Sequence, residues 1–392
     1  MILFEDAYKK VTEVDGFQFK VETVELLSSN TRILAEDAIS DVNMPPFDKA
    51  AMDGYACRKQ DIENELSVLE VIQAGKVPQK KISANQCSKI MTGAMLPEGA
   101  DTIIIVEDVD ELGNEKIKFR GKLHRSNFVK KADDVKIGDV LIKKGTLIKP
   151  QHVAILASIG YSKVKVYRKV NVAIISTGSE LVEPNQKPGL SQIRNSNAYQ
   201  LFSQIQRIGA EPTYFGIAED TKESTTKILK QAFDNCDVVL LTGGVSMGDF
   251  DFVPEVLSEM GVNQIFHNIA IQPGKPTMFG RIGNKFCFGL PGNPVSSFTI
   301  FELLSKPLIY KLMGYEYTPL KISLPMGIDY KRKRAERMSW IPIIINEIGE
   351  IMPIDYHGSA HTHALNIADG LIAIPIGKTE ILKGEKFDVR QI

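Results

Sequence analysis

The spacing of apolar residues changes along the chain, and each change marks a region with a different expected structure. Residues 4–11 have a helical spacing, and extended segments follow around 23–27 and 32–35. From about 46 to 140 the apolar runs are short, and turn sequences such as Pro97-Glu98-Gly99 separate them. Short apolar runs between turns are typical of strands, so this region predicts a small β domain.

The region after about residue 140 contains a helix and a strand. Pro150 suits the first position of a helix, and a strand is expected over 163–167. Both can pair with the N-terminal segment, which would make the β domain an insertion. We therefore expect a discontinuous N-terminal domain over 1–45 and 141–168, interrupted by an inserted β domain over 46–140.

Residues 169–315 alternate between apolar strands and amphipathic helices. Strands are expected over 170–176 and 238–241, and helices before Gly209 and over 221–233. This alternation predicts an α/β domain with a mostly parallel sheet that helices cover on both faces.

The helical period disappears after about Tyr315, and short apolar runs take its place. Residues 322–324, 341–345 and 371–376 are expected as strands of a small β barrel or sandwich. We expect a β-barrel domain over 316–392, and the expected fold class is therefore multidomain α/β plus β.

Composition narrows the class of protein. The 392 residues are 43% hydrophobic and 24% charged, which is the balance of an ordinary globular protein. Lys+Arg 47 against Asp+Glu 48 leaves a net charge of -1, so no overall field favours nucleic acid or an anionic membrane. Four widely spaced cysteines argue against a zinc ribbon or a disulfide framework. The N-terminus is unlike a signal peptide and no apolar run approaches the ~20 residues of a membrane span, so we expect a cytoplasmic protein.

Three glycine-rich loops lie next to predicted strands of the α/β region: Ser176–Leu181, Thr242–Asp251 and Gly289–Ser297. Glycine lets the backbone approach a ligand closely, and a helix N-terminus offers unpaired N–H groups to an anion. One such loop can be an ordinary tight turn. Three at one edge of a sheet favour a site for a phosphate or another oxyanion.

Acidic residues near strand ends are candidates for a metal site. Glu180, Asp220, Asp249 and Asp251 fall at or near the ends of separate strands. Carboxylate oxygens there can hold Mg²⁺, which keeps several waters and bridges substrate phosphates. Asp220 has a second interpretation as a helix N-cap, and Asp251 has one as a charge at a helix start.

Basic side chains could complement an anion. Lys275 stands on the turn Gln272–Pro276, which two prolines make rigid, and it offers a point charge. Arg337 follows the basic run 331–334, which is more typical of a solvated face than of a nucleic-acid patch. Three histidines between 357 and 363 have metal-ligand spacing but no fourth ligand, so we expect ordinary surface or packing histidines there.

A serine hydrolase is the main alternative to an oxyanion site. Gly244-x-Ser246-x-Gly248 has the spacing of a nucleophile elbow, and His267 lies downstream. The adjacent Gly243 and the acidic Asp249–Asp251 make this loop more flexible and more acidic than an elbow. We therefore favour the oxyanion site.

Six segments together resemble the molybdopterin molybdenumtransferase family, which includes the MoeA proteins and the gephyrin E domain. The segments follow the family's order over nearly the whole chain, and the C-terminal β region with H-G-S-A-H is also similar. No single segment would suffice, but together they are specific. The six segments are Pro45–Ala56, Met91–Asp101, Ser176–Asn197, Thr242–Asp251, Pro273–Pro276 and Gly289–Ser297.

The resemblance implies a fold, a reaction and an assembly. The α/β domain would bind molybdopterin between an inserted β domain and a C-terminal β barrel. The reaction would insert molybdate into adenylylated molybdopterin with Mg²⁺, giving molybdenum cofactor and AMP. The protein would be an elongated homodimer whose cleft combines two domains of one subunit with the inserted domain of the other. Another enzyme of the same pathway would hand over the pterin.

The resemblance also assigns roles to residues. The catalytic positions would be Asp53 and Thr92, which reach the cleft from the partner subunit, and Glu180, Asp220 and Asp251. Of these, Asp220 and Asp251 would bind Mg²⁺. The residues that would bind the pterin and the oxyanions are Gly243, Gly244, Ser246, Lys275, Pro276, Pro291, Gly292, Asn293, Pro294, Ser296, Arg337 and Ser359.

The chain departs from the family pattern near these positions. Many family members carry a lysine at the position of Gln272, and some carry a second lysine at the position of Asn268. Molybdate binding would then depend more on Lys275 and Arg337. Ser179 replaces a common aspartate, and Ala50, in the first of the six segments, replaces a common serine.

Two other functions remain open beside the hydrolase. A scaffold that binds partner proteins would use the same fold, but the chain lacks the long linker and extra domain that such a scaffold carries. A stand-alone adenylyltransferase acting on molybdopterin would need only the α/β domain, which leaves the other domains without a purpose.

Overall fold

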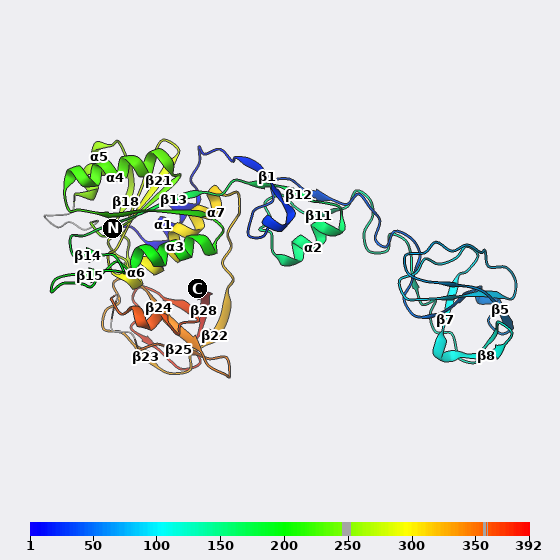
Figure 1. The fold of residues 1–392 in the computed structure, drawn as a ribbon. Helices are drawn as coiled ribbons and strands as arrows, with labels where there is room; N and C mark the ends of the chain where they lie inside the picture. Colours follow the sequence, from blue (N-terminus) through cyan, green and yellow to red (C-terminus); the bar gives the residue numbers. More distant parts are fainter. Residues whose placement is uncertain (245–251, 356–357, 359) are drawn as a thin grey trace. The chain divides into compact units, whose positions relative to one another are not determined.

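The computed structural model describes residues 1–244, 252–355, 358 and 360–392. Contacts within the chain group it into two compact units (Figure 1). Unit 1 comprises Met1–Ala35, Gly145–Lys149 and Val164–Ile392, and unit 2 comprises Glu36–Lys144 and Pro150–Lys163. The second unit is therefore made of two insertions into the first. The boundaries expected for four separate domains stay predictions.

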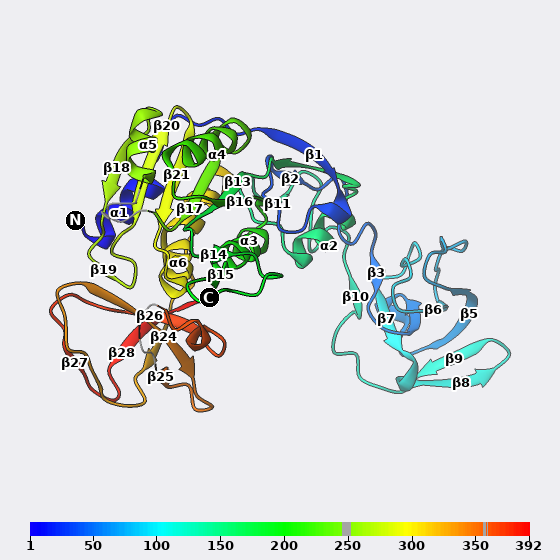
Figure 2. The same ribbon diagram turned by 60° about the vertical axis from the view of Figure 1, so that its left-hand side comes forward.

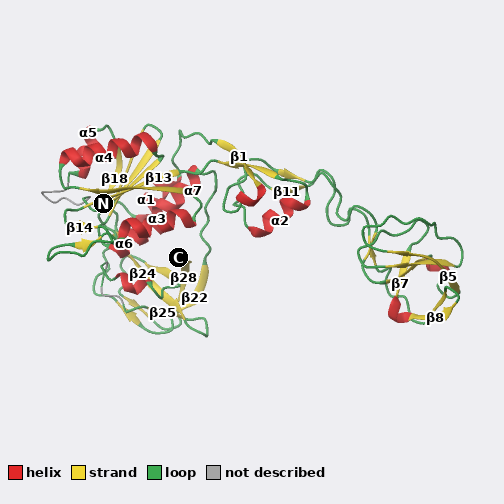
Figure 3. Ribbon diagram, viewed as in Figure 1, coloured by secondary structure: helices red, strands yellow, loops and turns green. Residues whose placement is uncertain are grey.

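Unit 2 is built on a six-stranded sheet with the strand order β7-β4-β6-β5-β9-β8. Figure 3 labels three of these strands, β5, β7 and β8. Neighbouring strands run antiparallel except β5 and β6, which are parallel. Tyr55 and Cys57 enter one hydrophobic core, and Ala56 between them enters another, so both faces of the sheet are buried. The strands are β4 (Gly54–Cys57), β5 (Glu65–Ile72), β6 (Gln86–Ile90), β7 (Thr102–Ile105), β8 (Val109–Gly113) and β9 (Lys116–Phe119).

Short elements complete unit 2. Two ladders of two strands each pair the beginning of the unit with its end. The helix expected at Pro150 is present as α2 (Pro150–Ser158). The remaining elements are β2 (Ala38–Ile39) with β11 (Val140–Ile142), β3 (Lys49–Ala50) with β10 (Phe128–Val129), and the 3₁₀ turns η2 (Lys59–Asp61) and η3 (Val106–Asp108).

Unit 1 contains the expected α/β sheet, with the strand order β16-β13-β17-β21-β20-β18. The first four strands are parallel, and β20 and β18 are antiparallel to their neighbours, so the sheet is mixed. Sequence patterns predicted β13 and β17 but neither antiparallel strand. The strands are β13 (Asn171–Thr177), β16 (Glu211–Ala218), β17 (Val238–Thr242), β18 (Asn263–His267), β20 (Met278–Ile282) and β21 (Lys285–Leu290).

Helices cover both faces of this sheet (Figure 2). Val172 and Ile174 of β13 enter a core with α1, α3, α6 and α7, whereas Ala173 and Ile175 enter a second core with α4 and α5. The alternation follows from the two-residue period of a strand. The helices are α1 (Phe4–Thr12), α3 (Asn197–Arg207), α4 (Lys222–Asn235), α5 (Val253–Glu259), α6 (Pro294–Ile300) and α7 (Lys306–Leu312), with the π-helical turn η4 (Phe301–Ser305) between the last two.

A second sheet of unit 1 is formed mainly by the C-terminal region, with the order β19-β24-β26-β28-β22 and with β25 beside β24. A single bridge from Met326, which follows β22, to Ile351 of β25 connects the far strand back to that pair. Its core contains mostly isoleucines. The elements are β19 (Ile271–Gln272), β22 (Ile322–Pro325), β24 (Met338–Ile345), β25 (Ile351–Pro353), β26 (Gly370–Ile374) and β28 (Lys386–Gln391), with β23 (Tyr330–Lys331), β27 (Glu380–Ile381) and η5 (Thr362–Leu365) beside them.

The N-terminal segment is joined to unit 1 by strand pairing. The segment expected as a strand over 163–167 is β12 (Lys163–Tyr167), and it pairs with β1 (Val21–Glu25), which the short turn η1 (Leu26–Ser28) follows. Two short strands, β14 (Leu181–Val182) and β15 (Ile193–Arg194), pair beside the α/β sheet. Among the described residues, every helix is too short or too polar to cross a membrane.

Candidate functional site

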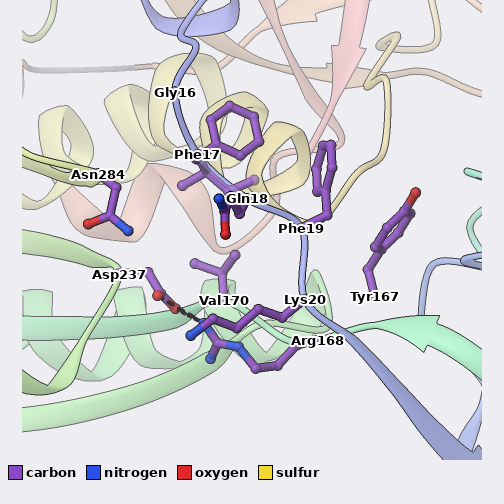
Figure 4. Close-up of a pocket in the computed structure, with 11 residues that line it drawn as sticks. Gly16, Phe17, Gln18, Phe19, Lys20, Tyr167, Arg168, Val170, Asp237 and Asn284 are labelled. Carbon is purple, nitrogen blue, oxygen red and sulfur yellow. Dashed lines mark hydrogen bonds and ion pairs between the residues drawn. The ribbon is translucent and has the colours of Figure 1, made fainter.

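Two cavities lie at opposite ends of the α/β sheet of unit 1. One, of about 360 Å³, lies at the amino ends of the parallel strands, where Asp237 precedes β17 (Figure 4). Its ionic groups satisfy each other, because Arg168 Nη2 donates to both Asp237 carboxylate oxygens at 2.8 and 2.9 Å. The other, of about 560 Å³, lies at the carboxyl ends of β13, β17 and β21. Ligands of open α/β sheets bind at the carboxyl ends, so this second cavity is the candidate site.

All three glycine-rich loops reach this carboxyl-end cavity. Thr177 and Thr242 end two of its strands, and both line it. Ala360, next to the expected Ser359, contributes from the C-terminal region. The expected residues that line the cavity are Glu180, Gly243, Pro276, Pro291, Gly292, Asn293 and Pro294.

The two glycines after β17 allow the first two loops to approach each other. Gly243 has a φ of +85°, and a Cβ there would lie 2.5 Å from the carbonyl oxygen of Thr177. Gly244 has a φ of +60°, and a Cβ there would lie 2.6 Å from Thr177 Oγ1. A side chain at either position would be strained and would push the loops apart, so the shape of the cavity depends on both glycines.

A chain of hydrogen bonds begins at Thr242, which lines the cavity, and leads through Asn195, which also lines it, to residues outside the lining. Thr242 Oγ1 donates to Ser176 Oγ at 3.3 Å, and Ser176 Oγ donates to Asn195 Oδ1 at 3.1 Å. Asn195 Nδ2 donates to the phenol oxygen of Tyr214 at 2.8 Å, and Tyr214 donates to Glu183 Oε1 at 2.7 Å. The chain holds Asn195, which lines the cavity, between β13 and β16.

Sequence reasoning did not assign this hydrogen-bond chain to the site. Asn195 and Glu183 both lie within the recognised segment Ser176–Asn197, so the sequence did point to their region, but Tyr214 lies outside all six segments. Partial burial and the hydrogen bond to Glu183 raise the pKa of the Tyr214 phenol above its ordinary value. The phenol therefore stays protonated and remains a donor to Glu183.

The P-G-N-P loop is fixed from helix α3. Asn197 Nδ2 donates to the carbonyl oxygen of Gly292 at 2.7 Å, and Gln200 Nε2 donates to that of Pro294 at 3.4 Å. Ser296, expected to bind the pterin, is 3% exposed within α6. Since Ser296 does not line the cavity, its contribution is to the packing beneath the loop.

Asp220 does not cap helix α4. Thr221 is the N-cap, and its Oγ1 accepts from the backbone N–H of Ser224. Asp220 Oδ2 instead accepts two hydrogen bonds from Ser179, one from the backbone N–H and one from the hydroxyl, each 2.8 Å long. The carboxylate is thereby held against the loop that carries Glu180.

The loop that carries Lys275 is connected to the C-terminal sheet. Ile271 and Gln272 of β19 pair with Met338 and Ser339 of β24. Arg337, directly before β24, donates from Nη1 to the carbonyl oxygen of Ile271 at 3.3 Å. The fold therefore brings together the two expected oxyanion-binding segments, which are about 60 residues apart in the sequence. Lys275 is exposed; neither it nor Arg337 lines the cavity, but Pro276, the residue after Lys275, does.

Asp53 and Thr92 belong to unit 2, where they contact each other. Asp53 Oδ1 accepts from the backbone N–H of Thr92 at 2.7 Å and from its hydroxyl at 2.6 Å. Both hydrogen bonds lower the pKa of the Asp53 carboxyl, and the one from the Thr92 hydroxyl has the larger effect. Two backbone hydrogen bonds join the same two segments, because Ala50 N–H donates to the carbonyl oxygen of Ala94 and Gly93 N–H donates to that of Ala50. The two motifs that the sequence shows 39 positions apart are thus one local structure.

Three expected site residues, Ser246, Asp251 and Ser359, lie outside the described residues, as does Asp249. The described part does test the hydrolase alternative through His267. That residue ends β18, which is three strands away from β17 in the sheet. At ~4.8 Å between strands the end of β18 is ~14 Å from the end of β17, so the sheet does not place His267 beside the end of the strand that precedes the glycine loop.

The described residues also test the metal site. No group of three or more His, Cys, Asp or Glu side chains among them could hold an ion. Asp220 does not line the cavity itself, but it offers a carboxylate oxygen beyond the one that Ser179 occupies, and Glu180, the residue after Ser179, does line the cavity. Mg²⁺ commonly takes one or two carboxylates and completes its shell with waters and substrate phosphates, so this donor set fits it.

Comparisons with known proteins agree with this arrangement. Residues 2–160 match the MoeA N-terminal region (domain I and II), 173–311 the probable molybdopterin binding domain, and 324–392 the MoeA C-terminal region (domain IV). The molybdopterin molybdenumtransferase of Staphylococcus aureus strain COL is 33% identical over 377 residues, which are 94% of this chain and 90% of that one. The molybdopterin molybdenumtransferase of Staphylococcus epidermidis strain ATCC 35984 is 32% identical over 398 residues, covering 99% and 95%.

Solved structures show the same relationship. The molybdopterin biosynthesis moeA protein of Pyrococcus horikoshii OT3 is 30% identical, with a TM-score of 0.86 and full coverage of both chains. A second structure of a Pyrococcus moeA protein gives 34% identity and a TM-score of 0.81 over 100% of this chain and 99% of that one. The multidomain fold and the resemblance of the chain to the family are confirmed. The chain belongs to the molybdopterin molybdenumtransferase family, a family of transferase enzymes in molybdenum cofactor biosynthesis.

Proposed function

We propose that this protein inserts molybdate into adenylylated molybdopterin, with Mg²⁺, and releases AMP. The observation that carries the proposal is the convergence of three glycine-rich loops, Pro276 and the Ala360 segment on one cavity of about 560 Å³. A volume of this size suits a ligand such as a pterin with a phosphate group. The position at the carboxyl edge of the sheet is where such ligands bind.

Electrostatics is the main task of such a site, because both substrates are anions that repel each other. Lys275 and Arg337 would hold molybdate, whose charge is spread over four oxygens. Backbone N–H groups at the start of α3, where Ser196 and Asn197 line the cavity, would face the pyrophosphate. Preorganised donors of this kind stabilise charge without rearranging during the reaction.

Mg²⁺ would be held by Asp220 and Asp251, and when bound it would neutralise part of the pyrophosphate charge. Ser179 keeps the Asp220 carboxylate in place through two hydrogen bonds. Glu180 would exclude a second anion from the cavity's edge. The Asn197–Gly292 hydrogen bond would hold the P-G-N-P loop beneath the pterin ring.

Asp53 and Thr92 would act from the partner subunit of a homodimer. The two hydrogen bonds from Thr92 lower the pKa of the Asp53 carboxyl and fix its Oδ1, so its other oxygen can orient a donor group of the substrate. The pterin would come from another enzyme of the same pathway, and we place the reaction in the cytoplasm. Sedimentation at assay concentration tests the assembly, and a strictly monomeric but fully active protein would contradict it.

One assay tests the reaction. Purified protein with adenylylated molybdopterin is expected to release AMP only when molybdate and Mg²⁺ are both present. Lys275→Ala and Arg337→Ala are expected to raise the molybdate concentration needed for half-maximal release by at least ~10-fold. Lys227→Ala, on the exposed side of α4, is the matched control. AMP release that does not depend on molybdate would refute the proposal, and AMP transfer from ATP to free molybdopterin would favour the adenylyltransferase.

A further inference from the structure

Among the described residues that line the carboxyl-end cavity, Glu180 and Arg194 are the only charged ones. The Glu180 carboxylate is folded back over its own loop, because a Cβ at Gly178 would lie 2.6 Å from Glu180 Oε2. No ion pair joins Glu180 to Arg194 in the described part of the chain. Arg194, in β15, has no role in the function proposed above. Its positive charge is therefore available to a ligand of this cavity.

Strand pairing and one side-chain hydrogen bond position Arg194. β15 is parallel to β14, with Arg194 opposite Val182, and the pair lies beside α6 in both ribbon views (Figures 1 and 2). Arg194 Nε donates to the carbonyl oxygen of Gln186 at 3.1 Å. Its two terminal nitrogens, Nη1 and Nη2, have no hydrogen-bond or ion-pair partner among the described residues. Two free nitrogens of one guanidinium suit two oxygens of one phosphate group.

Charges of both signs stand on the segments around the cavity but outside its lining. Glu183 and Asp220 are acidic, and each carboxylate already accepts two hydrogen bonds. The adjoining segments also carry Lys187, Lys275, Arg337 and Asp355. Because these charges have both signs, they produce no general attraction for anions at this edge of the sheet. An anion in the cavity would therefore be held by direct contact with Arg194.

Arg194 and Lys275 belong to segments at different positions along the sheet. Arg194 lies in the β14–β15 pair, which follows β13, whereas Lys275 stands shortly before β20. β13 and β20 are three strands apart in the sheet, or ~14 Å at ~4.8 Å between strands. A site for two different anions needs cations at two positions in this way. Since molybdate is proposed to lie at Lys275, Arg194 is the candidate partner of the phosphate groups.

We propose that Arg194 binds the pyrophosphate of adenylylated molybdopterin through Nη1 and Nη2, and thereby selects a phosphorylated ligand over one that lacks phosphate. The assignment rests on the function proposed above, and it adds a side-chain cation to the backbone N–H groups at the start of α3. Arg194 stands two positions before Ser196, the N-cap of that helix, so both kinds of donor belong to one short segment.

Calorimetric titration of the full-length protein tests the contact without turnover, with AMP and adenosine as probes, because AMP keeps one of the two phosphates. AMP is expected to bind at least ~10-fold more tightly than adenosine, and Arg194→Gln is expected to remove that preference while leaving adenosine binding unchanged. Arg194→Lys keeps the charge and should retain part of the preference. Lys187→Gln, at an exposed position between β14 and β15, is the matched control. Wild-type protein that does not prefer AMP, or Arg194→Gln protein that still does, would overturn the proposal.

The AMP-release assay separates this proposal from the function on which it rests. Arg194→Gln is expected to raise the concentration of adenylylated molybdopterin needed for half-maximal release at least ~10-fold and to leave the molybdate requirement unchanged, the reverse of Lys275→Ala. A higher molybdate requirement in Arg194→Gln would assign the residue to molybdate and overturn the proposal. If release depends on molybdate but Arg194→Gln matches wild type, only the role of Arg194 fails. If release proceeds without molybdate, the proposed reaction fails, and the AMP titration still decides the role of Arg194.

Discussion

Ser179 donates two hydrogen bonds of 2.8 Å to one oxygen of Asp220, and so joins the loop after β13 to the start of α4. The contact explains why a carboxylate at this position need not cap the helix, since Thr221 already does so. It leaves the second oxygen of Asp220 as the one available to a cation. Ser179 can fill this role because both its backbone N–H and its hydroxyl are donors to Asp220.

Asp220→Asn is expected to lower AMP release at least ~10-fold and to raise the Mg²⁺ concentration needed for half-maximal rate. The amide keeps the shape of the side chain but removes the charge. Glu223→Gln, in the first turn of α4, is the control for charge alone. If Asp220→Asn retains its Mg²⁺ dependence, the carboxylate only organises the loop.

Thr92→Ala is expected to raise the pKa of Asp53 towards its ordinary value of 3.8, as carbon-detected NMR titration would show. The pKa of Asp53 is lower in the folded protein than in the unfolded chain. The stabilisation by Thr92 is therefore fully present at pH values above the ordinary pKa of 3.8, and it is lost as the pH falls through the pKa of the folded state. The stability difference between wild type and Thr92→Ala should therefore shrink on acidification. Thr92→Ser keeps the hydroxyl and should retain the depressed pKa. An unchanged Asp53 titration in Thr92→Ala would contradict this account.

Gly243→Ala is expected to destabilise unit 1 by ~2–4 kcal/mol in urea unfolding, because strain at positive φ adds to the contact with Thr177. Gly261 has a similar φ of +82°, but a Cβ at that position would meet nothing within 4 Å, so Gly261→Ala measures the backbone effect alone. If both variants lose the same free energy of unfolding, the contact of the new Cβ at position 243 with Thr177 makes no contribution.

Tyr214→Phe is expected to lower the free energy of unfolding by ~1–2 kcal/mol, since Asn195 loses an acceptor and Glu183 loses a donor. Tyr199 also donates to Glu183, at 2.9 Å, but from an exposed position. Tyr199→Phe is therefore the matched control and should cost less than ~0.5 kcal/mol. Similar effects of the two variants would show that the chain to Asn195 contributes little.

The local spacing of apolar residues was sufficient to predict helices and strands in which that spacing is uninterrupted. The helix expected over 4–11 is α1, and the strand expected over 163–167 is β12. Strand β16 was missed because Pro212 and Gly216 interrupt its pattern. The structure explains the proline, since β16 is an edge strand, where a missing N–H donor is tolerated. The antiparallel pair β20–β21 was missed because a tight turn, not a helix, connects its strands.

The site was predictable where its residues lie in loops with strong local constraints, as at Gly243 and Pro291. The contacts that organise these loops come from distant parts of the chain, as between Asn197 and Gly292, which are 95 positions apart. No local pattern indicates which partner a polar side chain will find. The choice of Thr221 over Asp220 as the N-cap is an example at the shortest range, because both residue types suit that position.

The pairing of β19 with β24 has a consequence for how such a protein can be taken apart. The turn bearing Lys275 is anchored by residues of the C-terminal region, so deleting that region would remove Arg337 and also release the turn. In a shortened chain that contains only the α/β sheet and its helices, other contacts would have to hold the turn that carries the Lys275 ammonium. A gene fusion or truncation made between the α/β region and the C-terminal region would therefore still break the β19–β24 pairing that both regions share.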